Sequence, residues 1–452
     1  MSAVCAVARA RLPSSPTVTM SLRHRLSEYA KYESRICQEL MGLGGLSAAT
    51  ALRVIGRNRR AIELETSVHR NALSAIAEPI IERRFRKALR ATPALEGFME
   101  NLAPQHSTQV FFDDPERLLG QRILVIKSPR GAEKGVLLMD YSFVFPLLIR
   151  YFDLQAIAHR YYLVTEPSWS GLCDREVMCV AGRGFPVFVQ TNEPRDIAFL
   201  ERLDLDTIPV PIAANWWVDT RVFHPLPAVT PDADLVMNSA WSGFKRHGEV
   251  FEALARLRAR GIKLKTLLVG YTGDMTRANV EAMARQHGVF DQLEIFEKLR
   301  PHQVNEVMNR AKVNIIWSRR EGSNRAIIEG FAAGVPGILR EGFNFGHKYP
   351  YINRQTGAYA SQSTLPDTLL RMIRDRASFD PRTWMVANMS PQIATREIDE
   401  HISAYAAKKG EPWSRGELAQ KVTSLHSMAY WNESERARFD ADYAFLKASR
   451  IR

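Results

Sequence analysis

The feature that most constrains this 452-residue sequence is a regular alternation of short apolar runs and amphipathic stretches after residue 233. The apolar runs predict strands at residues 234–240, 264–271, 292–299, 312–318, 336–340 and 357–361. Helical spacing of apolar residues predicts helices at residues 248–260, 275–286, 302–310, 324–333 and 365–374. Such alternation builds a parallel sheet with helices on both faces, so these residues predict a doubly wound α/β domain.

A second set of apolar runs precedes this one, at residues 122–127, 161–167, 177–182, 186–194 and 207–215. These runs predict strands of a first α/β domain. Residues 224–234, a polar segment with three prolines, predict the boundary between the two. We therefore expect two doubly wound domains, at residues 120–225 and 226–394. A helical N-terminal extension is predicted at 20–119 and a helical C-terminal segment at 395–452, whereas residues 1–19 resemble a disordered tail.

Composition limits the class of protein. Hydrophobic residues make up 46% and charged residues 24% of the chain, which is typical of a globular protein. No apolar run approaches the roughly 20 residues of a membrane-spanning helix. The four cysteines lack metal-site spacing, so they predict reduced thiols in a cytoplasmic protein without a metal cofactor.

The charge is uneven. Of the net charge of +12, residues 1–100 contribute +7, with 16 Lys/Arg against 9 Glu. This excess predicts an anionic partner, such as lipid headgroups, a phosphorylated acceptor or nucleic acid. The alternative is a solvated basic surface. The interleaved segment 83–87, Arg-Arg-Phe-Arg-Lys, fits a helix at a membrane surface and a docked helix equally well.

The segment that carries chemistry is NIIWSRREGSNRAIIEGFAAGVPGIL, residues 314–339. A strand ends at Trp317 and a helix opens at about Ser323, whose first turn offers free N–H groups and a positive dipole end to a diphosphate. Gly322 lets a ligand approach the backbone closely. Glu321 and Glu329 can lie on one helical face, where carboxylates suit sugar hydroxyls. The alternative is a helix cap at Glu321 and a surface residue at Glu329.

These residues resemble the E-x7-E region of family 4 glycosyltransferases. Four upstream segments resemble the same family in the same order: ANWWVDTRVFHP (214–225), MNSAWSGFKRHGEVFEALARLR (237–258), KTLLVGYTGD (265–274) and VNEVMNRAKVNIIWS (304–318). The resemblance is continuous from about residue 205 to 375. Residues 120–205 share only the general architecture, and residues 1–119 do not match. The resemblance implies a GT-B fold, in which the two domains face a cleft, and glycosyl transfer with retention.

The resemblance also implies roles for single residues. Glu329 would accept from the nucleotide ribose, Glu321 would contact the donor sugar, and Lys245 would neutralise the departing diphosphate. The backbone amides of Gly322, Ser323 and Asn324 would face the diphosphate. The family usually has an arginine shortly before the lysine, and this chain has none there. Four arginines are candidates to replace it: Arg246, Arg319, Arg320 and Arg325.

In GT-B enzymes the acceptor binds to the first domain. The loop predicted at residues 127–142 carries Gly131 and Gly135, which let a substrate approach. Asn192 and Glu193 stand at a strand end where family members often carry a histidine. The aromatic-rich loop 341–361 adds His347 and Tyr349 as candidates to hold a sugar or a base.

The predicted function is transfer of a sugar from a nucleotide-diphosphate sugar to a glycan, lipid-linked or small-molecule acceptor, as in polysaccharide biosynthesis. A nucleotide-sugar epimerase of GT-B fold and a non-catalytic sugar-nucleotide-binding protein are the alternatives. The resemblance implies no catalytic metal and no nucleic-acid partner. Peripheral contact of the basic extension with an anionic membrane, at its inner face, is a further expectation.

Overall fold

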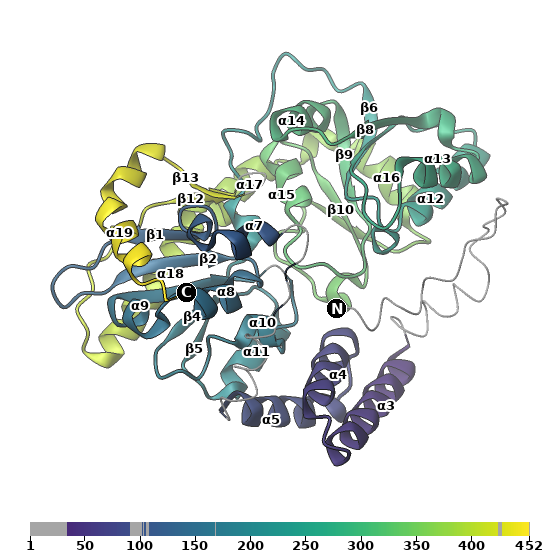
Figure 1. Ribbon diagram of the computed structural model, residues 1–452. Coiled ribbons are helices and arrows are strands. Elements are labelled where there is room, and N and C mark those ends of the chain that lie inside the picture. Colours follow the sequence, from purple (N-terminus) through teal and green to yellow (C-terminus); the bar gives the residue numbers. More distant parts are fainter. Residues whose placement is uncertain are drawn as a thin grey trace.

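The computed structural model describes residues 34–90, 102, 104, 108–167, 169–423 and 427–451 of the chain. In these residues the chain forms two α/β units, each around its own sheet (Figure 1). The predicted tail at 1–19, Cys5 and the start of the predicted extension lie outside the described residues. Among the described helices, none combines the length and apolar character needed to cross a membrane.

The first sheet has the strand order β1-β2-β3-β4-β5. Its strands are β1 Ile123–Lys127, β2 Gly135–Asp140, β3 Tyr161–Glu166, β4 Val187–Gln190 and β5 Thr207–Val210. Four helices connect them: α8 Val144–Tyr151, α9 Leu154–Arg160, α10 Arg175–Met178 and α11 Pro194–Leu203. β1 pairs antiparallel with β2, and the other pairs are parallel. The expected doubly wound order is absent from this sheet, because its strands follow one another in sequence without the reversal that defines that topology.

The second sheet has the order β11-β10-β9-β6-β7-β8, with every pair parallel. Its strands are β6 Ala233–Asn238, β7 Thr266–Gly270, β8 Leu293–Glu297, β9 Ala311–Ile316, β10 Gly337–Arg340 and β11 Gly357–Ala360. Its helices are α12 His247–Ala259, α13 Arg277–Gln286, α14 Pro301–Asn309, α15 Arg325–Ala332 and α16 Leu365–Arg374. The doubly wound prediction is confirmed for this unit, since the strand order reverses between β6 and β9.

The C-terminal part of the chain returns to the first unit. α17 Pro381–Met389 packs into the core of the second unit, and α18 Pro391–Lys409 joins the core of the first. The pair β12 Lys421–Thr423 and β13 Met428–Tyr430 follows, and then α19 Asp440–Ala448. Tyr161 and Tyr162, successive residues of β3, point to opposite faces of the sheet. Tyr161 meets Phe445 of α19 and Tyr162 meets Tyr405 of α18, so the returning segment covers both faces.

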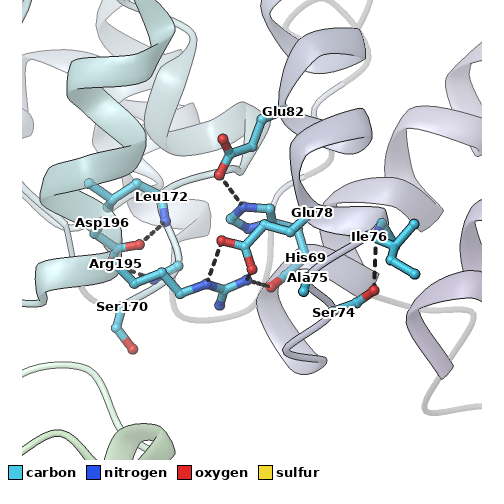
Figure 2. A network of polar contacts seen from close by, with 12 residues as sticks. His69, Ser74, Ala75, Ile76, Glu78, Glu82, Ser170, Leu172, Arg195 and Asp196 are labelled. Carbon is cyan, nitrogen blue, oxygen red and sulfur yellow. Dashed lines mark hydrogen bonds and ion pairs between the residues drawn. The ribbon is translucent and has the colours of Figure 1, made fainter. Parts of the chain in front are cut away.

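Three N-terminal helices dock on the first unit. They are α3 Arg35–Val54, α4 Asn58–Asn71 and α5 Ala77–Arg90. Phe85 of α5 is 2% exposed and packs against Phe199 of α11. Beside it, Arg202 of α11 binds Glu82 of α5 at 2.7 Å. Arg195 binds Glu78 at 3.0 Å (Figure 2). The sequence of residues 83–87 fits both a helix at a membrane surface and a docked helix. The structure shows the docked helix, because the apolar face of α5 packs on α11.

Three further predictions for the first unit and its attached segment are wrong. Residues 177–182 form the end of α10 and a turn instead of a strand, because the side chain of Asp174 caps a helix by accepting from the N–H of Glu176. Residues 127–142 are not one loop, because Gly135 already starts β2. The C-terminal segment is not wholly helical, because it contains β12 and β13. Short apolar runs do not distinguish a strand from a buried helix, which explains the first error.

Candidate active site

The candidate site lies at the point where the second sheet reverses its strand order. β6 and β9 are neighbours there, so the connections that follow their carboxyl ends run to opposite sides of the sheet. The loop after β6 carries Lys245, and the loop after β9 carries Glu321. Both residues therefore come to the one edge of the sheet where open α/β folds bind ligands.

Glu321 and Lys245 meet directly. The Lys245 Nζ atom lies 2.8 Å from Glu321 Oε1, and the Glu321 side chain is 9% exposed. Ser318 donates to the same carboxylate oxygen, and Asn324 Nδ2 donates to Oε2 at 2.5 Å. The carboxylate thus has a cation and two neutral donors, which fix its orientation in a buried position.

The helix that follows begins one turn after Glu321. Asn324 is the N-cap of α15, and its side-chain oxygen accepts from the N–H of Ile327 at 3.1 Å. The predicted alternative, a cap at Glu321, is therefore wrong. Gly322 and Ser323 are half-buried and connect Glu321 to this cap. The positive end of α15 thus lies beside the Lys245–Glu321 pair, which suits a ligand with negative charge.

Glu329 lies on α15, two turns beyond Glu321, and it faces β6. Asn238, the last residue of β6, donates to Glu329 Oε2 at 3.1 Å. Burial raises the pKa of Glu329, and Arg325 and the Asn238 amide act in the opposite direction. Glu329 as a whole residue is half-buried. The alternative of a plain surface residue is thus wrong for Glu329.

The other candidate cations differ in their surroundings. Arg246 has a left-handed backbone (φ 60°) and pairs with Glu249 of α12, which also accepts from Trp317 and Arg340. Arg325 opens α15, and within the described part of the chain it has no ion-pair partner. Arg325 therefore lies at the amino end of α15 without a carboxylate of any described residue in contact, whereas Arg246 already binds the carboxylate of Glu249.

Arg320 turns toward the first unit instead of the Lys245 loop. Its guanidinium donates to the carbonyl of Ser170 and to Asn71 of α4, both at 3.4 Å. Burial lowers its pKa to about 10, with Arg70 and Arg195 adding to the effect. Arg320 thus joins the second unit to the first unit and to the N-terminal helices, and this position does not match a donor-phosphate role.

A strained loop completes the second-unit side of the site. Asn344 and Phe345 both have left-handed backbones, with φ of 42° and 62°. Such conformations cost about 1 kcal/mol or more per non-glycine residue and persist where surrounding contacts hold them. Asn344 Oδ1 accepts from the N–H of Glu321 at 3.0 Å, and Asn344 Nδ2 donates to the Tyr349 hydroxyl at 2.7 Å.

Sequence reasoning missed Asn344, although the two glycines that flank it, Gly342 and Gly346, signalled an unusual loop. The candidate His347 lies beside this loop rather than in it. The His347 ring packs edge-on against the Tyr349 ring, with 4.5 Å between the ring centroids. Burial lowers the pKa of His347.

The first unit reaches the site through Glu193, at the carboxyl end of β4. The Tyr349 hydroxyl donates to Glu193 Oε2 at 2.7 Å, so this candidate does lie against the second unit. Asn192 beside it is half-buried. Gly131 lies in the turn between β1 and β2, at the amino end of β2 and thus at the opposite edge of the sheet. The expectation that Gly131 lines the cleft is wrong, because residues 135–140 pair back as a hairpin.

The protonation of Glu193 gives a prediction for stability. Burial raises the pKa of Glu193 to about 7, with the Tyr349 hydrogen bond acting against the shift. A raised carboxyl pKa means that its contribution to stability is complete below the unfolded pKa and is lost as pH rises through about 7.

Glu193→Gln has no charge to bury. We therefore expect its free energy of unfolding, relative to that of the native chain, to rise by about 2 kcal/mol from pH 5 to pH 8. Denaturant unfolding at both pH values measures this difference. Glu201→Gln, an exposed position on the same helix, is the control. An equal pH dependence for Glu193→Gln and the native chain would contradict the assigned protonation.

One group of side chains among the described residues has the composition of a metal site. It consists of His69, Glu78 and Glu82, whose ligand atoms lie within 4.8 Å of one another. Glu78 already binds Arg195 of α11, and Glu82 contacts His69 (Figure 2) and binds Arg202 of α11. Burial raises the pKa of Glu82, but hydrogen bonds from His69 and Arg202 outweigh it and lower the pKa to about 2. We interpret this group as the ionic contact that fixes the N-terminal helices to the first unit.

Comparison with protein-family models gives a match within the second unit. Residues 226–375 match the family model described as "Glycosyl transferases group 1", which is about one third of the chain. A comparison with curated protein sequences gives no match.

Several solved structures are distantly similar. Sucrose-phosphate synthase from Thermosynechococcus elongatus is 17% identical, with 60% of this chain and 73% of that chain covered and a TM-score of 0.46. TarM from S. aureus, in complex with UDP and other ligands, is 12% identical, with 58% and 55% covered and a TM-score of 0.47. HepE from Anabaena, in complex with UDP and glucose, is 15% identical, with 54% and 72% covered and a TM-score of 0.43. This chain spans only about half the length of TarM. The part of the chain that carries the candidate site, residues 226–375, is similar to the glycosyl transferases group 1 family.

Proposed function

We propose that this protein is a glycosyltransferase that uses a nucleotide-diphosphate sugar as donor. The observation that carries the proposal is the contact of Lys245 Nζ with Glu321 Oε1 at 2.8 Å, at the strand-order reversal and beside the amino end of α15. This arrangement sets a fixed cation and a helix end where a diphosphate would gain negative charge as it leaves. It lies in the segment that matches the family model.

The donor would lie across the reversal point. Glu329, fixed by Asn238, would accept from the ribose hydroxyls. Glu321, held by Lys245 and Asn324, would contact the donor sugar. Arg325 would supply the second positive charge at the diphosphate. Lys245, Arg325 and the end of α15 could together perform the charge neutralisation that a metal ion provides in other enzymes, so the proposal includes no metal cofactor.

The acceptor would approach from the first unit. We propose a glycan, a lipid-linked sugar or a small molecule, with retention of the anomeric configuration in the product. Glu193 of the first unit faces this region and accepts from the Tyr349 hydroxyl of the second unit at 2.7 Å. Its pKa of about 7 allows it to accept a hydrogen bond in one state and donate one in the other.

The experiment that tests the proposal is a panel of nucleotide sugars with UDP, GDP and ADP as the nucleotide. Donor binding at a hundredfold excess over Kd should stabilise the fold by about 2.7 kcal/mol, which thermal unfolding detects. The stabilising donor is then incubated without acceptor. Slow release of the nucleoside diphosphate and free sugar supports a transferase. Formation of an epimer would instead identify a nucleotide-sugar epimerase, and binding without turnover a non-catalytic binding protein.

Peripheral contact with an anionic membrane, at the cytoplasmic face, is part of the same proposal. Support comes from α3, on which Ile36 is 75% and Leu40 63% exposed, and from the exposed arginines Arg57, Arg59 and Arg60 at the start of α4. Basic side chains near such a surface contribute about 1 kcal/mol each, screened by salt.

We expect full-length protein to co-sediment with anionic vesicles at low salt and to be released at high salt, whereas neutral vesicles should not bind it. A variant with Arg57, Arg59 and Arg60 all changed to Ala should lose most of this binding. The matched control is a triple alanine variant at Lys263, Lys298 and Arg354, in the second unit. No sedimentation of the native protein with anionic vesicles at low salt would refute the membrane contact.

A further inference from the structure

The backbone of Glu321 is held on both sides of its Cα atom. Its N–H donates to Asn344 Oδ1 at 3.0 Å, and its carbonyl oxygen accepts from Ser170 Oγ at 3.1 Å. Asn344 belongs to the second unit and Ser170 to the first. A residue that carries a reacting group is thus anchored by its backbone to the opposite unit of the molecule.

The contact on the N–H side also leads to the first unit. Asn344 Nδ2 donates to the Tyr349 hydroxyl at 2.7 Å, and that hydroxyl donates to Glu193 Oε2 at 2.7 Å. Each group in this chain of hydrogen bonds has one available orientation. If the Asn344 amide turned over, Nδ2 would face the N–H of Glu321, and two bonds would be lost. The Asn344, Tyr349 and Glu193 side chains are buried, so water does not substitute easily for a missing partner.

The contact on the carbonyl side is supported by the first turn of α11, which follows Glu193. Asp196, three residues after Glu193 in α11, accepts from the N–H groups of Gly171 and Leu172 at 2.7 and 3.1 Å (Figure 2). These two bonds fix the segment that presents Ser170. The first turn of α11 therefore supports both ends of the Glu321 peptide, through Glu193 on one side and Asp196 on the other.

We propose that Glu193 and Tyr349 are positioning residues, which set the orientation of Glu321 only when the two units are in contact. In this arrangement the carboxylate of Glu321 reaches its working position together with closure of the first unit on the second. Separation of the units would break the Ser170–Glu321 contact, which anchors the Glu321 carbonyl, and the Tyr349–Glu193 contact, which supports the Asn344 anchor of the Glu321 N–H through Tyr349. The proposal rests on the proposed function only where turnover is measured.

Hydrogen–deuterium exchange of the full-length protein tests the proposal without any ligand. Tyr349→Phe keeps the ring that stacks on Tyr351 at 4.9 Å and removes only the hydroxyl. We expect exchange in peptides that contain residues 318–324 to become at least about fivefold faster, because the hydroxyl's bonds to Asn344 and Glu193 are both lost and even one net hydrogen bond contributes about 1 kcal/mol. Glu193→Ala should accelerate the same peptides, and the double variant should add little, because both changes break one chain of contacts. Glu193→Gln, whose oxygen still accepts from Tyr349, should restore native exchange.

Tyr405→Phe, which removes a hydroxyl on α18 in the first unit, is the control and should leave these peptides unchanged. The proposal is overturned if Tyr349→Phe leaves exchange at 318–324 as in the native chain, or if Glu193→Gln behaves like Glu193→Ala. With the donor found in the nucleotide-sugar panel, Tyr349→Phe should lower kcat and leave the donor KM within about twofold, since the diphosphate contacts are untouched. If the variants change exchange as expected but the protein turns over no nucleotide sugar, the proposed function is refuted and the positioning role stands.

Discussion

Lys245→Ala is expected to lower the turnover number by about 10²–10³ and to weaken donor affinity much less. The Lys245 ammonium lies 2.8 Å from Glu321 and is only slightly exposed, so its charge acts in a region with little water. A fixed cation counts most when the leaving diphosphate gains negative charge, which happens in the transition state and not in the bound donor. Turnover and calorimetric donor affinity, measured on the same preparation, separate the two effects.

Two further variants make this result interpretable. Lys245→Met keeps the apolar stem near Phe244 and should behave like Lys245→Ala if the charge is what matters. Lys263→Ala, an exposed lysine of the same unit, should leave turnover unchanged. A native turnover number for Lys245→Ala would show that another cation neutralises the diphosphate, and Arg325 would then be the first candidate.

Glu329→Ala is expected to weaken donor binding about a hundredfold or more without unfolding the protein. Hydrogen bonds to a charged group contribute about 1.5–3 kcal/mol each, and a ribose offers two hydroxyls. Burial raises the pKa of Glu329, so donor affinity should also begin to fall at a higher pH than for an ordinary carboxyl group as the solution is acidified.

Isothermal titration calorimetry with the donor from the nucleotide-sugar panel measures this loss. Glu306→Ala, an exposed glutamate on the neighbouring helix α14, is the matched control and should bind the donor normally. An intact donor affinity in Glu329→Ala would refute the ribose contact. The Glu329–Asn238 hydrogen bond would then have a structural role only.

The second unit was predictable almost element by element. Every strand and helix expected between residues 234 and 374 is present within a few residues of its expected bounds. The reason is physical: an apolar run between turn residues and a helical period are local signals, and in a strict alternation each signal supports the next. The proximity of Glu321 and Lys245 was predictable for the same reason, since both follow carboxyl ends of strands in this unit.

The first unit was less predictable because its structure depends on distant partners. Residues 135–140 pair with β1 as a hairpin, which removes Gly131 from the cleft edge. The sequence signal at this position, glycines between apolar runs, fits a loop and a hairpin equally well. Residues 177–182 likewise have a strand-like composition, and Asp174 decides for a helix through one capping bond.

By itself, the sequence determined the two α/β units and the alternation in the second, because these follow from short-range patterns of apolar, glycine and charged residues. Its resemblance to a known family, and not these patterns, pointed to Lys245, Glu321 and Glu329 as site residues. Only the tertiary structure decided that residues 391–451 return to the first unit and that α5 docks on α11. It alone brought Glu193, Tyr349 and Asn344 to the Glu321 peptide. These contacts join residues more than a hundred positions apart in the chain or depend on left-handed backbone at Asn344, and neither leaves a periodic trace in the sequence.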